Sequence, residues 1–482
     1  MSIFSDIADI TGDLAYSVRS ISNDLFSPSL RLGVTGLSRS GKTVFTTALV
    51  HHLTGGLNNM PAFRAAAEGR IRRARLTPQP DDGVPRFPYE QHVNALIDKR
   101  QWPSSTTQIS ELRLDIEYER KRGWRSGPGA LTLDIVDYPG EWILDLALID
   151  TSYYEWSRKA VQLSRRADNL PQAETWLEYV RGINPSILAD ELVAEEASQL
   201  FKDYLLALHQ RPQAVATVPP GRFLMPGDLQ GAPALTFAPL ILTEGEPIQT
   251  GSLAQLMERR FEAYKRLVIR PFFREHFQRI DRQIVLVDVL SALDEGPAAI
   301  AELEEAIDQV LLAFRTGKNS LFSKIFSPRA ERVLFAATKA DHIHHIQHDR
   351  LEAFLRFLVA RAVRRTEATG ARVASLALAS VRATRETTVR DGRDILKAVS
   401  GIPEAGELVG DELFDGESEA VVFPGELPSE PAEVIKGAIV PGSLRFPRFR
   451  PPQLNDTSMR FESLPHIRLD RALEFLIGDQ LI

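Results

Sequence analysis

Short apolar segments alternate with longer stretches of helical periodicity along most of the chain. In the segment Leu112–Tyr118 apolar residues alternate with charged ones, which is the pattern of a half-buried strand. The other strand-like segments are short apolar runs bounded by turn residues. The predicted strands are Leu32–Thr35, Leu112–Tyr118, Leu131–Asp137, Ile284–Asp288, Val333–Ala337 and Val373–Ala379. The glycine-rich connection between the second and third predicts an antiparallel hairpin.

Apolar residues spaced three and four apart predict helices between these strands. Between about Trp142 and Ile280 strand patterns nearly vanish, which predicts one inserted helical domain. A basic stretch from Arg64 to Arg75 is also expected to be helical. The remaining predicted helices are one that ends at Leu53, then Tyr154–Arg166, Ala173–Val180, Leu188–Leu208, Ser252–Arg270, Ala298–Phe314, Arg350–Arg364 and Leu469–Ile477.

The first residues also have helical spacing. In Phe4–Ile21 apolar residues form one face and acidic residues, such as Asp6 and Asp9, lie on the other. A helix that lies on a membrane usually carries Lys and Arg on its polar face. We therefore expect this helix to pack on the protein's own core.

Composition excludes several classes of function. The chain has 482 residues, which predicts two or three domains. Its 57 basic and 64 acidic residues give a net charge of -7, which argues against non-specific binding of nucleic acid. Because the chain has no cysteine, disulfides, thiolate metal sites and cysteine nucleophiles are excluded. No apolar run is long enough to span a bilayer and no signal-peptide pattern precedes the first strand, so we expect a cytoplasmic protein without a transmembrane segment.

The first motif is a phosphate-binding P-loop between a predicted strand and a predicted helix. It reads Gly36-Leu37-Ser38-Arg39-Ser40-Gly41-Lys42-Thr43 and matches every fixed position of the pattern. The backbone N–H groups of such a loop surround an anion, and the helix N-terminus adds partial positive charge. Lys42 is expected to contact the β- and γ-phosphates, and the Thr43 hydroxyl to ligate Mg²⁺. The alternative, an ordinary glycine-rich turn, fits this strand-loop-helix context less well.

A second motif, Asp137-Tyr138-Pro139-Gly140-Glu141, closes the third predicted strand. An acidic residue at the end of a strand beside the P-loop strand can hold Mg²⁺ through water. Gly140 is expected to turn its amide toward the γ-phosphate. An Asp at a strand end often only caps the next helix. The assignment of Asp137 to a magnesium site therefore depends on the presence of the P-loop.

A third motif, Thr338-Lys339-Ala340-Asp341, follows the strand Val333–Ala337. The Asp341 carboxylate can accept hydrogen bonds from N1–H and the 2-amino group of guanine, a pattern that adenine does not offer. The stem of Lys339 is expected to pack over the base. The alternative is that Asp341 caps the following helix, and its place in the strand order favours guanine.

The order of these motifs resembles the GTP-binding domain of Ras-like GTPases. Thr338–Asp341 is similar to their Asn-Lys-x-Asp guanine motif, and Ala379-Ser380-Val381 stands where their Ser-Ala-Lys loop meets the base. With Asp137–Trp142 and Ala379–Thr384, most of the chain resembles the YcjX-like family, stress-associated bacterial proteins long labelled ATPases. The resemblance implies a three-layer α/β fold of Ras-like topology, with a mainly parallel sheet, one antiparallel edge strand and a large helical insertion.

The resemblance also implies a threonine that closes over the γ-phosphate and completes the magnesium shell. Thr106 and Thr107 lie where such a residue belongs, although an ordinary Ser/Thr turn explains either one equally well. Two positions depart from the family of Ras-like proteins: Thr338 replaces Asn, and Glu141 replaces the glutamine that positions water. A carboxylate is repelled by γ-phosphate oxygens, so Glu141 predicts slow hydrolysis.

Two further sets of residues, arginines and histidines, are also candidates for a role in chemistry. Arg39 is the closest candidate for an arginine that stabilises the transition state, and the stretch from Arg64 to Arg75 is better explained as a solvated helix face. His342, His344, His345 and His348 follow Asp341, and the i, i+4 pair His344 and His348 has the spacing of a zinc site. A tolerant, exposed helix start is the favoured explanation for these histidines.

We expect four parts: an N-terminal helix (1–28), a nucleotide-binding domain (29–145 and 281–400), a helical insertion (146–280) and a C-terminal extension (401–482). The favoured function is a GTP-binding switch that uses Mg²⁺, hydrolyses GTP slowly and acts in bacterial stress. Its partners are guanine nucleotide and an unidentified effector protein, for which a membrane-associated protein is one option. An ATPase and a nucleotide-binding scaffold with negligible turnover are the alternatives.

Overall fold

The computed structural model describes residues 28–482 except 38, 56, 105–107, 122–126, 166–169, 211–218, 224–225, 227–228, 313–329, 369, 411, 433–442 and 455–462. The predicted helix Phe4–Ile21 and three predicted site residues, Ser38, Thr106 and Thr107, lie outside the described residues.

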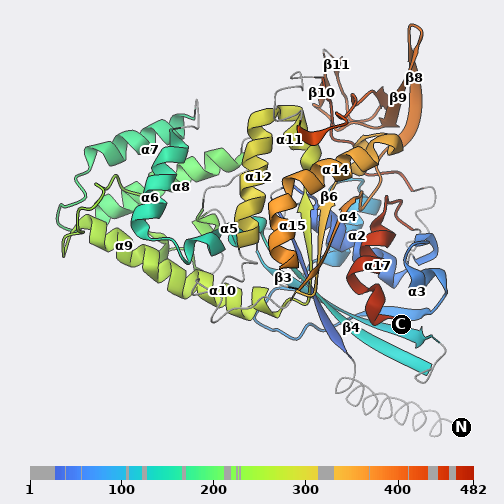
Figure 1. The fold of residues 1–482 in the computed structure, drawn as a ribbon, viewed down its shortest axis with the longest axis horizontal. Coiled ribbons are helices and arrows are strands. Elements are labelled where there is room, and N and C mark those ends of the chain that lie inside the picture. Colours follow the sequence, from blue (N-terminus) through green and yellow to red (C-terminus); the bar gives the residue numbers. More distant parts are fainter. Residues whose placement is uncertain are drawn as a thin grey trace, which may run out of the picture.

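A seven-stranded sheet in the order β2-β3-β4-β1-β5-β6-β7 lies at the centre of the larger part of the molecule (Figure 1). β1, β4, β5, β6 and β7 are parallel, and β3 is antiparallel to both of its neighbours. All six predicted strands are found. The strands are β1 (Ser29–Gly36), β2 (Ile71–Thr77), β3 (Ser110–Arg120), β4 (Gly127–Asp137), β5 (Arg282–Val287), β6 (Arg332–Ala337) and β7 (Arg372–Ala377).

The seventh strand, β2, corrects the prediction of a helix from Arg64 to Arg75. Only a single turn, α3 (Arg64–Ala67), is helical, and Ile71–Thr77 pairs with β3 at the edge of the sheet. A bulge between Ile71 and Arg73 adds one residue, so the inward side chains fall at Ile71, Ala74 and Leu76. The separation of three residues between Ile71 and Ala74 is also typical of one face of a helix, which explains the incorrect prediction. The predicted antiparallel strand, β3, is therefore one position in from the edge.

The central strands are buried on both faces because helices cover both sides of the sheet. On β5, Ile284 and Leu286 pack in one core with α2 (Lys42–Thr54) and α17 (Leu469–Ile477). Val285 and Val287 face the opposite core, which contains residues of the helices listed next. They are α11 (Val289–Glu295), α12 (Pro297–Leu312), α14 (His348–Leu358) and α15 (Ala360–Glu367). The sheet is thus the middle of three layers.

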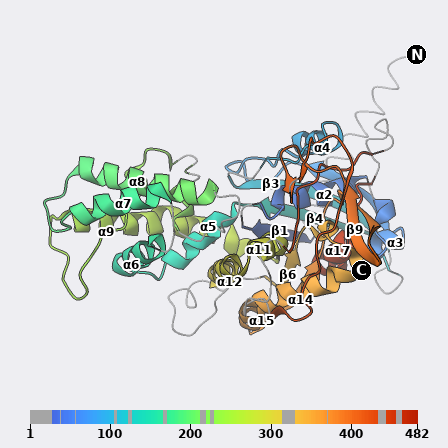
Figure 2. The ribbon, with the colours of Figure 1, turned by 90° about the horizontal axis from the view of Figure 1, so that it is seen from above.

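The described residues between β4 and β5 form helices and loops. Four of these helices, α6 to α9, lie together at one end of the molecule, beside the sheet in both views (Figures 1 and 2). The first helix, α5, lies directly after β4. The helices are α5 (Gly140–Leu144), α6 (Tyr153–Ser164), α7 (Pro171–Gly182), α8 (Glu191–Gln210), α9 (Leu253–Tyr264) and α10 (Arg270–Glu275). Helix α4 (Tyr89–Ile97) packs on α2.

The C-terminal part contains strands that the pattern of apolar residues did not predict. β8, β9 and β12 form a second, antiparallel sheet, and two short strands form a separate pair. Their bounds are β8 (Arg385–Asp391), β9 (Asp394–Gly401), β10 (Leu408–Val409), β11 (Glu412–Leu413) and β12 (Ala420–Val422). β8 reads Arg-Glu-Thr-Thr-Val-Arg-Asp, which has too few apolar residues to show a period of two. The terminal helix α17 has the predicted bounds.

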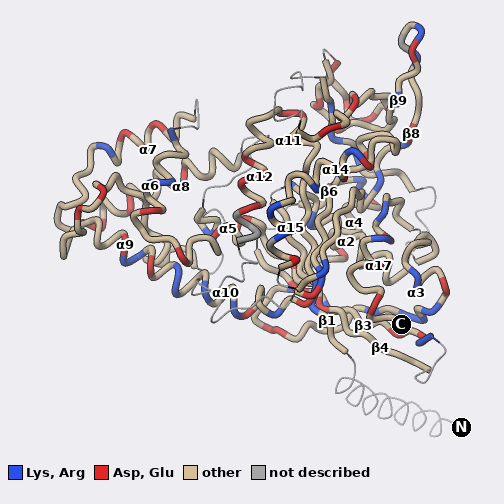
Figure 3. The backbone as a smooth tube through the Cα atoms, viewed as in Figure 1, with Lys and Arg blue, Asp and Glu red and all other residues tan. Residues whose placement is uncertain are grey.

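Charged residues of both signs are interspersed along the helices between β4 and β5 and along α14 and α15 (Figure 3). This distribution fits the small net charge of -7. Within the described part of the chain, none of the helices combines the length and the apolar character that crossing a membrane needs.

Candidate nucleotide site

The predicted P-loop connects β1 to α2, and two of its described residues have a left-handed backbone conformation. Arg39 and Gly41 have positive φ angles of 62° and 88°, which turn the chain sharply before α2. A Cβ on Gly36 would come within 2.4 Å of Leu286 O, so only glycine fits at this close approach to β5. Lys42 Nζ donates to Gly36 O at 2.7 Å and to Leu37 O at 3.2 Å. The ammonium group is thereby held over the loop.

Asp137 and Gly140 lie against this loop, as the second motif predicts. Asp137 ends β4 beside Val34 of β1, and its side chain is fully buried. A Cβ on Gly140 would come within 2.0 Å of Gly36 O, so the two backbones are in direct contact and a side chain is excluded. Thr43 Oγ1 donates to Ser104 O at 3.4 Å, which places the segment before β3 beside the start of α2.

Thr43 and Asp137 fit a magnesium ion by their chemistry. A hydroxyl and a carboxylate are the hard oxygen donors that Mg²⁺ prefers. Both side chains are buried. Asp137 ends β4, and Thr43 is the second residue of α2, directly after the P-loop. The third predicted ligand, Thr106, is outside the described residues.

The guanine motif is held by backbone contacts to the ends of the neighbouring strands. Thr338 N donates to Val287 O at 3.0 Å, and Ala340 N donates to Leu378 O at 3.1 Å. Lys339 has a left-handed φ of 60°, and its ammonium group is paired with the carboxylate of Asp288. Despite its burial, this pairing keeps the pKa of Asp288 below its ordinary value. The Lys339 side chain is therefore oriented before any ligand binds.

Asp341 is positioned by the turn that follows β7. Its Oδ2 accepts a hydrogen bond from Ala383 N at 2.8 Å, and its backbone carbonyl accepts one from the Thr384 hydroxyl. Helix α14 begins at His348, seven residues later, with Gln347 as its N-cap. The structure therefore does not use Asp341 as the cap of that helix.

One cavity of about 530 Å³ brings these motifs together, a volume typical of a small-molecule site. Its lining includes ten of the fourteen described site residues that the sequence predicted. They are Arg39, Gly41, Lys42, Thr43, Glu141, Thr338, Lys339, Asp341, Ser380 and Val381. Gly36, Ser40, Asp137 and Gly140 are not part of the lining, although the first and last touch each other beneath the P-loop.

Several lining residues were missed by the sequence motifs. Trp102, His209, His342, Glu404, Arg448 and Phe449 also line the cavity. Trp102 Nε1 donates to Phe449 O at 2.7 Å, and the Phe449 ring meets the His342 ring edge-on at 5.5 Å. These contacts bring the C-terminal part of the chain against Trp102 and His342 in the wall of the cavity. Phe449 follows a proline-rich stretch with no periodic pattern, so no signal in the sequence indicated it.

The two candidates for a catalytic arginine differ in position. Arg39 is exposed and lines the cavity. In the basic stretch, Arg70 pairs with Glu68 and Arg72 with Glu119 at the outer edge of the sheet. None of the arginines between 64 and 75 lines the cavity. This stretch is an edge strand with paired charges.

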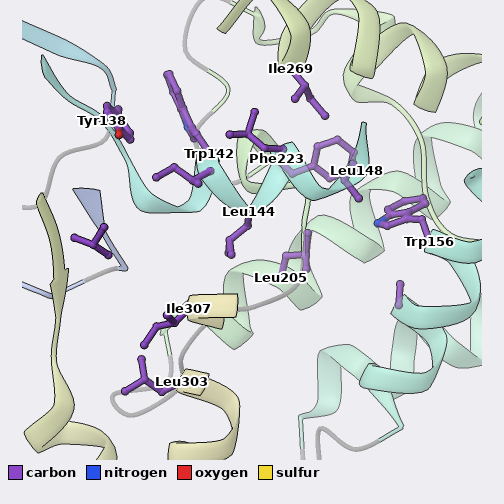
Figure 4. Packing of buried hydrophobic residues seen from close by; sticks show 14 of the residues in the cluster. Tyr138, Trp142, Leu144, Leu148, Trp156, Leu205, Phe223, Ile269, Leu303 and Ile307 are labelled. Carbon is purple, nitrogen blue, oxygen red and sulfur yellow. The ribbon is translucent and has the colours of Figure 1, made fainter. Parts of the chain in front are cut away.

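Glu141 is buried and lines the cavity at the start of α5. A loop from the helical segment lies directly on it, because a Cβ on Gly221 would come within 2.4 Å of Glu141 O. The next residue, Trp142, carries the Arg222 guanidinium 3.3 Å from its ring centre, a cation–π contact. Figure 4 shows Trp142 and Leu144 of α5 among apolar residues of the helices around it.

Asp145, just after α5, ties the same loop in place. Its carboxylate accepts hydrogen bonds from Gly221 N at 2.7 Å, from Arg222 N at 3.3 Å and from the Tyr264 hydroxyl. Burial raises the pKa of Asp145 to about 6, although these hydrogen bonds oppose the shift. The end of the Asp137–Glu141 motif is thus connected to α9 through one buried carboxylate.

Comparison with known proteins agrees with this geometry. Residues 30–481 match the model of the YcjX-like family. The chain is 37% identical over 475 residues to a protein of Escherichia coli strain K12 named "Ras-like GTPase YcjX", covering 94% of this chain and 96% of that one. It is 32% identical over 476 residues to a protein of the same name from Shewanella oneidensis, covering 94% of each chain.

Proposed function

The chain belongs to the YcjX-like family, and from that premise we propose that it is a GTP-binding switch protein. It binds GTP and GDP with Mg²⁺ and hydrolyses GTP slowly, in a bacterial stress response. The observation that carries this proposal is a cavity lined both by Lys42 and Thr43 of the P-loop and by Asp341 of the guanine motif. A nucleoside triphosphate extends between a phosphate-binding loop and a base-binding group in this way.

Asp341 supports guanine as the base. One carboxylate oxygen already accepts the Ala383 N–H, which fixes the side chain in the wall of the cavity. Carboxylate oxygens have lone pairs to spare for the two donors on the Watson–Crick edge of guanine. Adenine presents an acceptor at its N1 position, so the same carboxylate disfavours ATP.

The phosphate end is supported by charge and by backbone geometry. Lys42 is placed to neutralise the phosphates, and the N-terminus of α2 adds partial positive charge. Thr43 and Asp137 would hold Mg²⁺, which when bound neutralises charge on the phosphates. Gly140 lies against Gly36 and would offer its N–H group near the terminal phosphate.

Slow turnover is proposed from Glu141 and its surroundings. Ras-like proteins position the attacking water with a glutamine, whereas a carboxylate here is repelled by the terminal phosphate. Gly221 packs on the backbone of Glu141, which restricts its movement. This same observation favours the second candidate, a nucleotide-binding scaffold with negligible turnover.

We also propose how the parts of the chain contribute. Residues 29–145 and 281–400 form the nucleotide-binding domain, and 146–280 form a helical insertion that responds to the nucleotide through Glu141 and Asp145. Residues 401–482 extend that domain and wall the base end of the cavity. The N-terminal helix (1–28) would pack on the core. An effector protein would bind the helical insertion in a way that depends on its nucleotide-dependent conformation.

Single-turnover release of phosphate from GTP tests the hydrolytic proposal, with Lys42→Ala as the control. The wild type should release phosphate slowly with Mg²⁺, and the variant should bind GTP much more weakly because it lacks the charge on the phosphates. Unchanged GTP affinity of the variant by calorimetry would remove the P-loop assignment. GTP binding without phosphate release in the wild type would support the scaffold instead.

A further inference from the structure

Three potential metal ligands converge on the outer side of the guanine motif. His345 Nδ1 lies 2.6 Å from Glu386 Oε2, and His344 Nε2 lies 3.8 Å from the same oxygen. One ligand atom from each of the three residues lies within 4.8 Å of the others. The two imidazole rings are adjacent, with their centres 4.4 Å apart. Glu386 comes from β8, 41 residues along the chain from His345.

This cluster differs from the zinc pair that the sequence suggested. His344 and His348 are not on one helix, because His344 precedes the short 3₁₀ helix His345–Gln347 and His348 is the first residue of α14. His348 Nε2 is 2.9 Å from Ala340 O and is committed to that contact. No pattern in the sequence links Glu386 to these histidines, because β8 is not predicted from apolar periodicity. The i, i+4 alternative is therefore excluded. The favoured explanation, an exposed helix start, is wrong for His342, His344 and His348, because all three side chains are buried.

We propose that His344, His345 and Glu386 form a binding site for a divalent transition-metal ion such as Zn²⁺. Two imidazoles and one carboxylate are a known zinc donor set with three protein ligands, in which a water molecule completes the tetrahedron. Neutral imidazole also suits other borderline metals, whereas Mg²⁺ prefers oxygen donors alone. The site is separate from the Thr43 and Asp137 pair.

The two separations from Glu386 to the histidines require only small adjustments to accept the ion. Ligand atoms at about 2.0–2.1 Å from a tetrahedral Zn²⁺ are roughly 3.3–3.5 Å apart. The 2.6 Å separation must open and the 3.8 Å separation must close, each by less than about 1 Å. His345 is 62% exposed and can rotate, while the buried His344 supplies a fixed ligand. The ion would replace the direct contact between His345 Nδ1 and Glu386 Oε2.

The charges around the cluster act in both directions. His344 is buried, and its Nδ1 accepts the Ile346 N–H at 3.5 Å, so Nε2 must give up its proton when it binds the ion. Partial burial of Glu386 opposes its ionisation, but the hydrogen bond from His345 and the charges of nearby basic groups keep its pKa below the ordinary value. Arg382 lies 3.6 Å from Glu386 Oε1, and Lys397 is close enough to act on His344. The positive charges of Arg382 and Lys397 repel a metal cation, so we expect only moderate affinity of the site for Zn²⁺.

The position of the cluster gives it a consequence for the nucleotide site. The segments that carry its ligands are the same two that Asp341 joins through Ala383 and Thr384. A metal ion would add a second link between them, a few residues from the carboxylate in the cavity wall. We expect this link to slow the opening of the guanine end. This effect depends on the proposed function, whereas metal binding itself does not.

Calorimetric titration of the full chain with Zn²⁺ tests the site, with excess Mg²⁺ present to occupy the other one. The wild type should bind one Zn²⁺, and His345→Ala and Glu386→Gln should each weaken binding by at least about tenfold. His92→Ala, which alters a histidine on α4, is the matched control and should bind as the wild type does. Equal Zn²⁺ affinity in the wild type and both cluster variants would overturn the proposal, as would the absence of binding to the wild type.

Release of a fluorescent GDP analogue then tests the link to the cavity. Zn²⁺ should slow its release from the wild type and not from Glu386→Gln. An unchanged rate in wild type that has been shown to bind Zn²⁺ would remove the link and leave the metal site. A protein that takes up Zn²⁺ but no guanine nucleotide would instead count against the proposed function.

Discussion

The carboxylate of Asp341 is fixed by a hydrogen bond to a residue 42 positions later in the chain. That contact, with Ala383 N, depends on the turn after β7, and the pairing of Ala340 N with Leu378 O brings the two segments together. The group proposed to read the base is therefore preorganised, which reduces the entropy lost when a ligand binds.

Asp341→Asn should exchange the base preference of the protein. The new NH₂ group faces the guanine amine, which leaves two donors unpaired at a cost of about 1–3 kcal/mol. Xanthine has a carbonyl at that ring position, so the variant should gain affinity for xanthosine triphosphate. GTP affinity should fall by at least about tenfold, which equilibrium titration with both nucleotides measures. No exchange of preference would mean that Asp341 has only a structural role.

Phe449 is expected to contribute to nucleotide binding without selecting the base. Its ring lies in the cavity wall beside His342, and removal of an aromatic group that stacks on a base costs about 1–3 kcal/mol. Phe449→Ala should therefore weaken GTP and GDP binding to a similar extent. Phe357→Ala, which alters a partly exposed ring on α14, serves as the control. Equal nucleotide affinity in the two variants would place Phe449 outside the binding surface.

The elements of the central sheet could be predicted because burial enforces their patterns. Strands such as β5 and β6 are apolar on both sides, and β3 alternates because it is half-buried. β2 was missed because a bulge disturbs its period, and β8 was missed because its side chains are mostly polar. Long-range pairing, which leaves little trace in local sequence, decides both strands.

Helix α5 connects the nucleotide loop to the helices that follow it. Trp142 and Asp145 contact the loop that carries Gly221 and Arg222, and Asp145 also contacts Tyr264 of α9. A movement of Glu141 would therefore be transmitted to α9 through these contacts. The Asp145 carboxylate joins α5 to both the Gly221 loop and α9. The pH at which Asp145 titrates can therefore be used to test this connection.

Asp145→Asn should change how thermal stability depends on pH. The pKa of Asp145 rises from 3.8 to about 6 on folding, so the folded state binds the proton more tightly. The contribution of this group is therefore fully present below pH 3.8 and is lost as the pH rises through about 6. The melting temperature of the wild type minus that of the variant should fall across this window.

Calorimetric scans of both proteins at several pH values measure that difference. Tyr264→Phe keeps the buried carboxylate and should retain the pH dependence. A difference that stays constant, or increases with pH, would contradict the raised pKa of Asp145.

In the whole molecule, one cavity is built from segments that span more than 400 residues of the chain. The P-loop and the guanine motif could be predicted because phosphate and base recognition require particular residues at fixed spacing. The contributions of His209 of α8 and of Phe449 to the cavity wall could not be predicted. Residues that only shape a cavity wall need no fixed residue type or spacing, so they follow no motif. The same applies to Glu386, which reaches the histidines only through the tertiary fold.

The central claim is that the cavity binds guanine nucleotide in preference to adenine nucleotide. The most direct measurement is an equilibrium titration of nucleotide-free wild-type protein with GTP and with ATP, both with Mg²⁺. The account predicts that GTP binds at least about tenfold more tightly, because only guanine pairs with Asp341 through two donors. ATP binding as tight as GTP binding, or tighter, would contradict it.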